Sequence, residues 1–296
     1  MKKLIISKDH SGFRLDKSLC QIFDISFALS QKLLRQKKIK VNSKTHPASY
    51  RLQENDNLEI ISDINLRTIS VKKTFLNQSQ LKKFQSWIVY EDKDFVAINK
   101  PSGLATQGGS GIKISVDDFA KHHSYQLVHR LDKDTSGILL MAKSKSAAEF
   151  LIDSFKNKNI KKTYIALVNG IPTKNHGKIN IPLRKKIQGK NEKVLPDFEE
   201  GKEAITDFKI LRKFTDYCLI ELRPITGRTH QLRVHMKELG HPIINDVKYG
   251  GKSVLKKDIS DRLCLHAHKI VIDQYLTKDK IEIIASEPSP NSLNKF

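Results

Sequence analysis

The chain alternates short apolar runs with polar turns, a pattern that is typical of β-strands joined by tight connections. The runs at 125–128 and 138–142 flank a polar loop, and each is too short for a helix, so both predict buried or half-buried strands. Further strands are expected at 87–90, 95–98, 163–168, 204–208 and 217–222. The pattern predicts an α+β domain over residues 86–286, with a mixed, mainly antiparallel sheet and few helices.

Two helices interrupt this strand-rich region. The first is expected to begin with a capping box at 146–149 and to bury an apolar stripe that ends at Phe155. The second covers 228–239 and stops at Gly240, a residue that favours the end of a helix.

Residues 1–62 carry a different pattern and are expected to form a separate small α/β module. Apolar residues recur at helical spacing over 15–23, and the helix that follows could be capped by Ser26 or Ser30. Short runs after these helices predict a small sheet beside the pair.

The second helix of this module and its exit are basic. Their cations are Lys32, Arg35, Lys37 and Lys38. Residues 63–85 show no clear periodicity and predict a linker, which could end in a short helix. Residues 287–296 predict a frayed tail.

The polar loop at 129–137 lies between the two strands described first, at the end of the sheet. Asp, Thr, Ser and Gly follow one another there and favour an ordered turn, because short polar side chains bond the local backbone and Gly accepts a positive φ. A calcium loop would need an acid where Lys143 stands, and an aspartic protease would need a second such loop, which the sequence lacks. A plain tight turn capped by Asp134 remains open from this segment alone.

The net charge of the chain indicates what kind of binding partner to expect. The 296 residues hold 53 Lys and Arg against 32 Asp and Glu, for a formal net charge of +21. A surplus of this size favours a polyanion, because phosphates bound by cations release their counterions. A solvated basic surface without a partner is the alternative.

Several classes of protein and site lack support in the sequence. No apolar run approaches the ~20 residues that cross a bilayer, and the apolar run at the start of the chain is too short for a signal peptide, so we expect a cytoplasmic protein. The three cysteines are far apart and form no Cys-x-x-Cys, so no metal site is expected. The Gly-rich loop at 107–111 lacks the Lys-Ser/Thr ending of a P-loop, so no nucleotide cofactor is expected.

The sequence His-Arg-Leu-Asp-Lys-Asp-Thr-Ser-Gly at 129–137 resembles the central motif of the RluA-type family of RNA pseudouridine synthases. Two further blocks, at 162–170 and 224–235, resemble the same family in the same order. Residues 99–103 and the Gly-rich loop extend the resemblance over residues 85–270. Three ordered blocks are more specific than any one of them.

Residues 12–62 resemble the S4 RNA-binding module, which often precedes the catalytic domain in this family. The sequence departs at its turns, where Lys37 or Lys38, Ser43 and Asn55 stand in place of the module's usual Gly. Because Lys adopts a left-handed backbone poorly, we expect the exit of the second helix to be remodelled. The module and the Gly-rich loop look closest to the RluC-like members of the family, which act on large-subunit ribosomal RNA.

The resemblance implies a role for each matching residue. Asp132 would be the catalytic carboxylate, and Arg233 would pair with it and favour its charged form. Tyr164 would pack on the uracil ring and could assist removal of a proton from C5. Arg130 would enter the space left by the flipped base, and Arg228 would present its charge to the carboxylate or to phosphates.

The implied reaction moves uracil from an N1 to a C5 glycosidic link. One bond to C1′ breaks and another forms without redox chemistry, so no cofactor is implied. The expected partner is large-subunit ribosomal RNA, bound by a monomer through Arg130, Arg228, Lys32, Arg35, Lys37 and Lys38.

Two points stay open at this level. The basic insert at 183–193 is expected on the RNA face, with a solvated loop as the alternative. A non-catalytic S4-type ribosome-assembly factor would carry the same charge, but it would have no need for Asp132, Tyr164 and Arg233 together.

Overall fold

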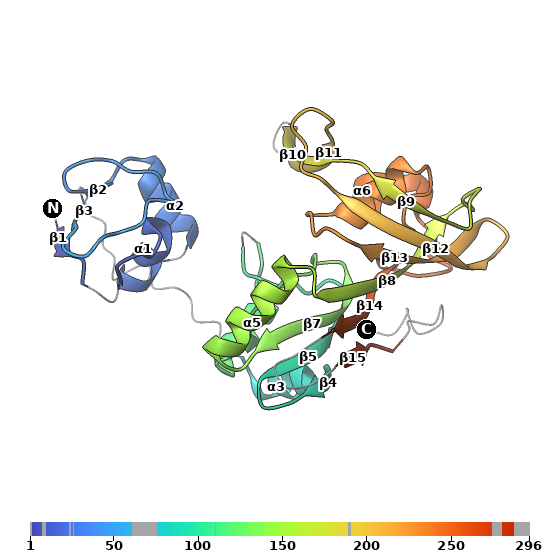
Figure 1. Cartoon of the computed structure of the whole chain (residues 1–296), viewed down its shortest axis with the longest axis horizontal. Helices are drawn as coiled ribbons and strands as arrows, with labels where there is room; N and C mark the ends of the chain where they lie inside the picture. Colours follow the sequence, from blue (N-terminus) through green and yellow to red (C-terminus); the bar gives the residue numbers. More distant parts are fainter. Residues whose placement is uncertain are drawn as a thin grey trace. The chain divides into compact units, whose positions relative to one another are not determined.

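The computed structural model describes residues 2–7, 10–23, 25, 27–60, 76–109, 111–188, 191–273 and 280–286. The chain divides into two compact units, Met1–Phe75 and Leu76–Phe296 (Figure 1). The sequence led us to expect a small module over 1–62, a linker over 63–85 and a larger domain over 86–286. The expected tail, 287–296, lies outside the described residues.

The first unit packs two helices on a three-stranded antiparallel sheet of order β1-β3-β2. Its elements are β1 (Lys2–Ile5), α1 (Leu15–Phe23), α2 (Phe27–Arg35), β2 (Ile39–Val41) and β3 (Asn57–Ile60). The helical spacing of Leu15 and Leu19 places both in the core, where they meet Leu33 of α2 and Leu58 of β3. The expected helix pair and small sheet are confirmed, and β1 is a strand that the sequence pattern did not indicate.

Two local expectations for this unit are wrong. Ser30 does not cap α2, because it lies inside the helix, is buried and donates its hydroxyl to the carbonyl oxygen of Asp16 at 2.8 Å. The exit of α2 is not remodelled, because Lys37 itself adopts the left-handed conformation with a φ of 55°. The amide of Lys38 then donates to the carbonyl of Leu33 at 3.0 Å, the closure that Gly usually provides. Ser26 lies outside the described residues.

The second unit is built on a ten-stranded sheet in the order β4-β5-β7-β14-β8-β13-β12-β9, with β6 paired to β7 and β15 to β14. Its first half comprises α3 (Gln78–Gln85), β4 (Ile88–Glu91), β5 (Phe95–Lys100), α4 (Val116–His122), β6 (Gln126–Leu127), β7 (Ser136–Ala142), α5 (Lys145–Lys156) and β8 (Ile160–Asn169). Its second half comprises β9 (His176–Asn180), β10 (Leu183–Gln188), β11 (Asn191–Pro196), β12 (Ile205–Lys213), β13 (Tyr217–Pro224), α6 (Gln231–Glu238), α7 (Val247–Gly250), the 3₁₀ helix η3 (Lys252–Val254), β14 (Leu265–Ile272) and β15 (Ile281–Ile284).

Among the described strands of this sheet, β7 and β14 run parallel and the other pairs are antiparallel. The expected mixed, mainly antiparallel α+β sheet is therefore confirmed. Helix α5 covers one face of β7 (Figure 1). Ile138 and Leu140 enter the core under α5, whereas Leu139 and Met141 enter the core formed with α3 and α4. Burial on both faces explains why this strand reads as a continuous apolar run.

The junction of β7 and β14 fixes where the polar loop ends. Gly137 has a φ of 109°, and a Cβ on it would overlap the main chain of Ala267. The preceding Ser136 lies 2.9 Å from Nδ1 of His266, from hydroxyl oxygen to ring nitrogen. Glycine is needed here because β14 passes directly against the loop exit.

Three sequence expectations change in the second unit. Helix α3 falls in the expected linker, but its Phe84 is fully buried and stacks on Phe119, so the helix belongs to this unit. Helix α5 is capped by Ser144, whose hydroxyl accepts the amide of Ala147 at 3.2 Å, and not by a box beginning at Ser146. The basic insert is a hairpin of β10 and β11 rather than an open loop.

Candidate active site

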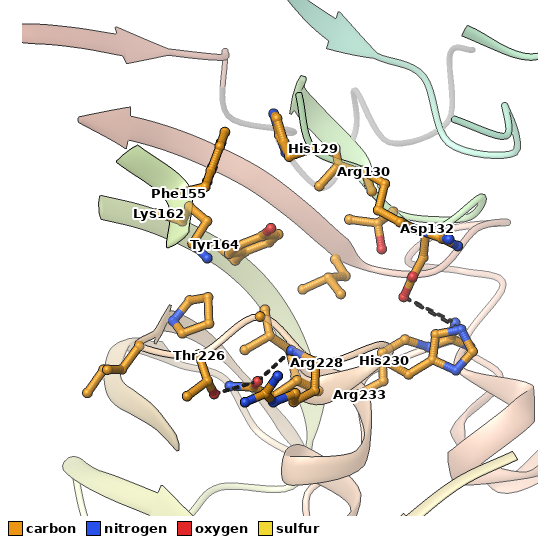
Figure 2. Close-up of a pocket in the computed structure, with 18 of the residues that line it drawn as sticks. His129, Arg130, Asp132, Phe155, Lys162, Tyr164, Thr226, Arg228, His230 and Arg233 are labelled. Atoms are coloured by element: carbon orange, nitrogen blue, oxygen red, sulfur yellow. Dashed lines mark hydrogen bonds and ion pairs between the residues drawn. The ribbon is translucent and has the colours of Figure 1, made fainter. Parts of the chain in front are cut away.

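The loop between β6 and β7 forms one wall of a cleft of about 570 Å³. The opposite wall comes from the turn after β13 and the start of α6, and β8 lies between the two walls (Figure 2). Five residues singled out in the sequence line this cleft: Arg130, Asp132, Tyr164, Arg228 and Arg233. Residues distant in the sequence thus meet around one carboxylate.

Residues in the segment 100–106 form hydrogen bonds with the main chain of the loop. The amino group of Lys100 donates to the carbonyl oxygens of Pro101, Leu104 and Lys133 at 2.9, 2.8 and 3.1 Å. The hydroxyl of Thr106 donates to the carbonyl of Leu131 at 2.7 Å and accepts its amide at 3.2 Å. These bonds clamp both sides of Asp132, so its backbone position is fixed before any substrate binds.

Lys100 is fully buried, and no role was expected for it, although its segment 99–103 belongs to the stretch that resembles the family. Burial lowers its pKa to about 7, although the charges of Asp134 and Asp132 act in the opposite direction. His129, at the other end of the loop, accepts the amide of Leu140 at 2.8 Å through Nε2. Burial lowers the pKa of His129 to about 3, so its ring is a neutral hydrogen-bond acceptor that supports the loop.

Asp132 projects into the cleft toward two residues of the opposite wall (Figure 2). Its Oδ2 lies 3.7 Å from Nε2 of His230 and 3.9 Å from Nη1 of Arg233. Its side chain keeps 20% of its surface exposed, so solvent or a substrate can reach it.

The expected pairing of Arg233 with Asp132 is only partly correct. The guanidinium faces Asp132, but its two short bonds go to Asp246, at 2.8 Å from Nε and 2.7 Å from Nη2. Burial by itself would lower the pKa of Arg233, but the bonds and charge of Asp246, joined by the charge of Asp132, raise it. Asp246 is fully buried and therefore fixes the orientation of Arg233. No sequence pattern pointed to this partner.

Tyr164 projects from β8 into the middle of the cleft (Figure 2). Burial raises its pKa, and the negative charge of Asp132 raises it further. The phenol is therefore protonated at neutral pH, and its aromatic face is available for packing on a base. Its expected part in proton removal stays a prediction.

The expected RNA-binding residues fall into two sets. Arg130 and Arg228 are exposed on the cleft, where Arg228 also donates through Nε to the carbonyl of Glu203 at 2.9 Å. The other set lies on α2 and its exit in the first unit, where Lys32, Arg35 and Lys37 are exposed and Lys38 is half-buried. The cations of the β10–β11 hairpin are partly neutralised, as Lys185 pairs with Glu192 at 2.5 Å and Lys186 with Asp197 at 2.8 Å.

Within the described ranges, no group of three or more His, Cys, Asp or Glu gathers as a metal site would require. No helix in the described part of the chain is long and apolar enough to cross a membrane.

The sequence and the fold were compared with those of known proteins. Residues 94–238 match the family described as RNA pseudouridylate synthase. The ribosomal large subunit pseudouridine synthase C of Rickettsia bellii is 40% identical over 288 residues, which cover 93% of this chain and 95% of that protein. The protein of the same name from Buchnera aphidicola is 37% identical over 295 residues, covering 96% and 93%.

The chain belongs to the RNA pseudouridine synthase family. As a pseudouridine synthase it is an isomerase. The solved human RNA pseudouridylate synthase domain containing 1 is 28% identical, with a TM-score of 0.59 over 69% of this chain and 85% of that one. The mixed sheet of the second unit is therefore the fold of a pseudouridine synthase.

Proposed function

We propose that this pseudouridine synthase converts uridines of large-subunit ribosomal RNA to pseudouridine, with Asp132 as its catalytic carboxylate. The observation that carries the proposal is the cleft itself. Asp132 is clamped through its backbone, remains accessible, and faces Tyr164, His230 and Arg233. The relatives that align along nearly the whole chain are named for large-subunit ribosomal RNA, which supports this substrate.

The reaction breaks the N1–C1′ bond, turns the base and joins C5 to C1′. C5 loses its proton to solvent, and N1 gains a proton, so the product is an isomer of the substrate. The target uridine leaves the RNA stack, at a cost of a few kcal/mol, and its base enters the cleft against Tyr164. Arg130 fills the vacated place in the stack. A carboxylate is suited to such a reaction because it can act as a nucleophile or as a base. No electron transfer or external energy is needed, so the enzyme acts without a cofactor.

Positive charge supports binding of the RNA backbone. The formal net charge is +21, and the exposed cations include Arg130 and Arg228 at the cleft and Lys32, Arg35 and Lys37 in the first unit. We propose that the first unit is an S4-like RNA-binding module, because its helix pair, small sheet and basic α2 agree with that resemblance. The protein would act in the cytoplasm as a monomer.

The decisive experiment measures tritium release from 5-tritiated uridine in unmodified large-subunit ribosomal RNA. Asp132→Asn keeps the size of the side chain and removes its charge, so we expect release to fall to background while RNA affinity stays within about twofold. Asp134→Asn, an equal change at an exposed residue of the same loop, is the matched control and should retain most activity.

The outcomes separate the candidate functions. Release by the wild type and by Asp134→Asn, but not by Asp132→Asn, supports the proposal. Full turnover by Asp132→Asn would remove this residue from the mechanism. No release by the wild type, with tight RNA binding retained, would favour the non-catalytic assembly factor instead.

A further inference from the structure

His230 has an unusual backbone for its position at the start of α6. Its φ and ψ are 53° and 18°, the left-handed region, which is strained for a residue with a side chain. This conformation aims the imidazole across the cleft, where Nε2 lies 3.7 Å from Oδ2 of Asp132 (Figure 2). The other ring nitrogen, Nδ1, lies 2.6 Å from the hydroxyl oxygen of Tyr249.

The hydrogen bonds of Tyr249 favour one of the two tautomers of neutral His230. The amide of Val194, in β11, donates to the Tyr249 hydroxyl oxygen at 3.3 Å. The phenol has one proton, which is free to be donated to Nδ1 of His230. A neutral ring that accepts at Nδ1 must carry its proton on Nε2, so that the N–H group is directed at Asp132.

Burial keeps this ring neutral near neutral pH. Burial lowers the pKa of His230, and Arg233 and Lys248 lower it further, while Asp132 and Asp246 act in the opposite direction. Arg233 also lies over the Tyr249 ring, with its guanidinium carbon 5.2 Å from the ring centre. The tyrosine thus contacts both residues that face the carboxylate.

We propose that His230 and Tyr249 are positioning residues for Asp132. Tyr249 fixes the tautomer of His230, and the Nε2–H of His230 holds one carboxylate oxygen in the orientation required for reaction. The separation of 3.7 Å shortens to a hydrogen bond when substrate fills the cleft, as is common for catalytic groups. This inference rests on the proposed role of Asp132 in pseudouridine formation.

Three variants distinguish positioning from simple packing. Tyr249→Phe removes the hydroxyl but keeps the ring beneath Arg233. His230→Asn suits the left-handed backbone, yet its amide reaches only as far as Nδ1 did. His230→Gln suits that backbone less well, but its amide extends to the place of Nε2 and can donate to Asp132 without help from Tyr249.

Each variant is assayed for tritium release from large-subunit ribosomal RNA, with KM, RNA affinity and thermal midpoint measured alongside. We expect Tyr249→Phe to lower kcat by about 10-fold with KM nearly unchanged, and His230→Asn to lower it more than His230→Gln. In the His230→Gln background, Tyr249→Phe should have no further effect on kcat. A wild-type kcat for Tyr249→Phe, or an Asn variant as active as the Gln variant, would overturn the proposal.

A second measurement does not depend on activity. Nitrogen-15 chemical shifts of labelled histidine report the tautomer directly, and wild-type His230 at pH 8 should carry its proton on Nε2. Loss of that preference in Tyr249→Phe supports the proposal that Tyr249 fixes the tautomer of His230. A proton on Nδ1 in the wild type would refute it. If the wild type released no tritium, the proposed function would fail, and these shifts would still decide the geometry.

Discussion

Lys100 offers a quantitative test of how the catalytic loop is held. Its amino group is fully buried and donates to three carbonyl oxygens, including that of Lys133 in the loop. Lys100→Met keeps the length of the side chain and removes the amino group. The three carbonyl oxygens then lose their hydrogen-bond donor, and the buried position no longer has a group that binds or releases a proton.

The size of the effect follows from the pKa of Lys100, which burial lowers from 10.5 to about 7. At pH values between about 7 and 10.5, Lys100 is protonated in the unfolded chain and largely deprotonated in the folded chain. The free energy of unfolding of the wild type therefore rises with pH in this range. The slope approaches about 1.4 kcal/mol per pH unit. Allowing for half-protonation at pH 7, the wild type gains about 2 kcal/mol between pH 7 and 9. Below pH 7 the cost of burying the charge is present in full.

Urea unfolding at pH 7, 8 and 9 measures this gain. The free energy of unfolding of the wild type, minus that of Lys100→Met, should increase by about 2 kcal/mol across the series. Lys93→Met, at an exposed position in the turn between β4 and β5, is the matched control and should follow the wild type. A difference that does not change with pH would refute the reasoning, because Lys100 would then bind its proton equally well in both states.

Two further predictions concern the fold and the RNA interface. Gly137→Ala should cost at least about 3 kcal/mol of unfolding free energy, because its Cβ would overlap Ala267, whereas Gly103→Ala, with a φ of 83° and open space, should cost about 1 kcal/mol. Equal costs in urea unfolding would contradict the close approach of β14. Replacing Lys32, Arg35 and Lys37 together by Ala should weaken RNA binding and reduce its slope against log salt concentration by about 2–3, with release from a short substrate unchanged. Unchanged affinity for folded ribosomal RNA would remove the first unit from the interface.

The strands and the loop were accessible from the sequence because their signals are local. The continuous apolar run of β7 reflects burial on both faces, and the turn formers after Asp132 mark the bend that the structure contains. The same reasoning placed helix α6 before Gly240. It allowed for a short helix at α3 but assigned it to the linker, because polar residues obscure the single buried anchor Phe84. It failed at the exit of α2, where the surrounding bonds hold Lys37 in a conformation that Lys seldom adopts.

The candidate site was predictable only in part. Motifs identified Asp132, Tyr164 and Arg233, and the structure brings all three to one cleft. The partners that orient them carry no comparable signal. Asp246 binds Arg233 through a contact between two segments, and Lys100 reaches the loop through main-chain carbonyls, which any sequence would supply.

The sequence by itself determined the order of strands and turns, the basic character of the chain and the residue types available for chemistry, because periodicity, turn preference and charge belong to neighbouring residues. Only the tertiary structure decided which groups face Asp132, since that depends on how β7, β8 and α6 pack. The left-handed backbone of His230 and the buried bond of Asp246 to Arg233 depend on how α6 packs against the start of α7, which offsets a small conformational cost.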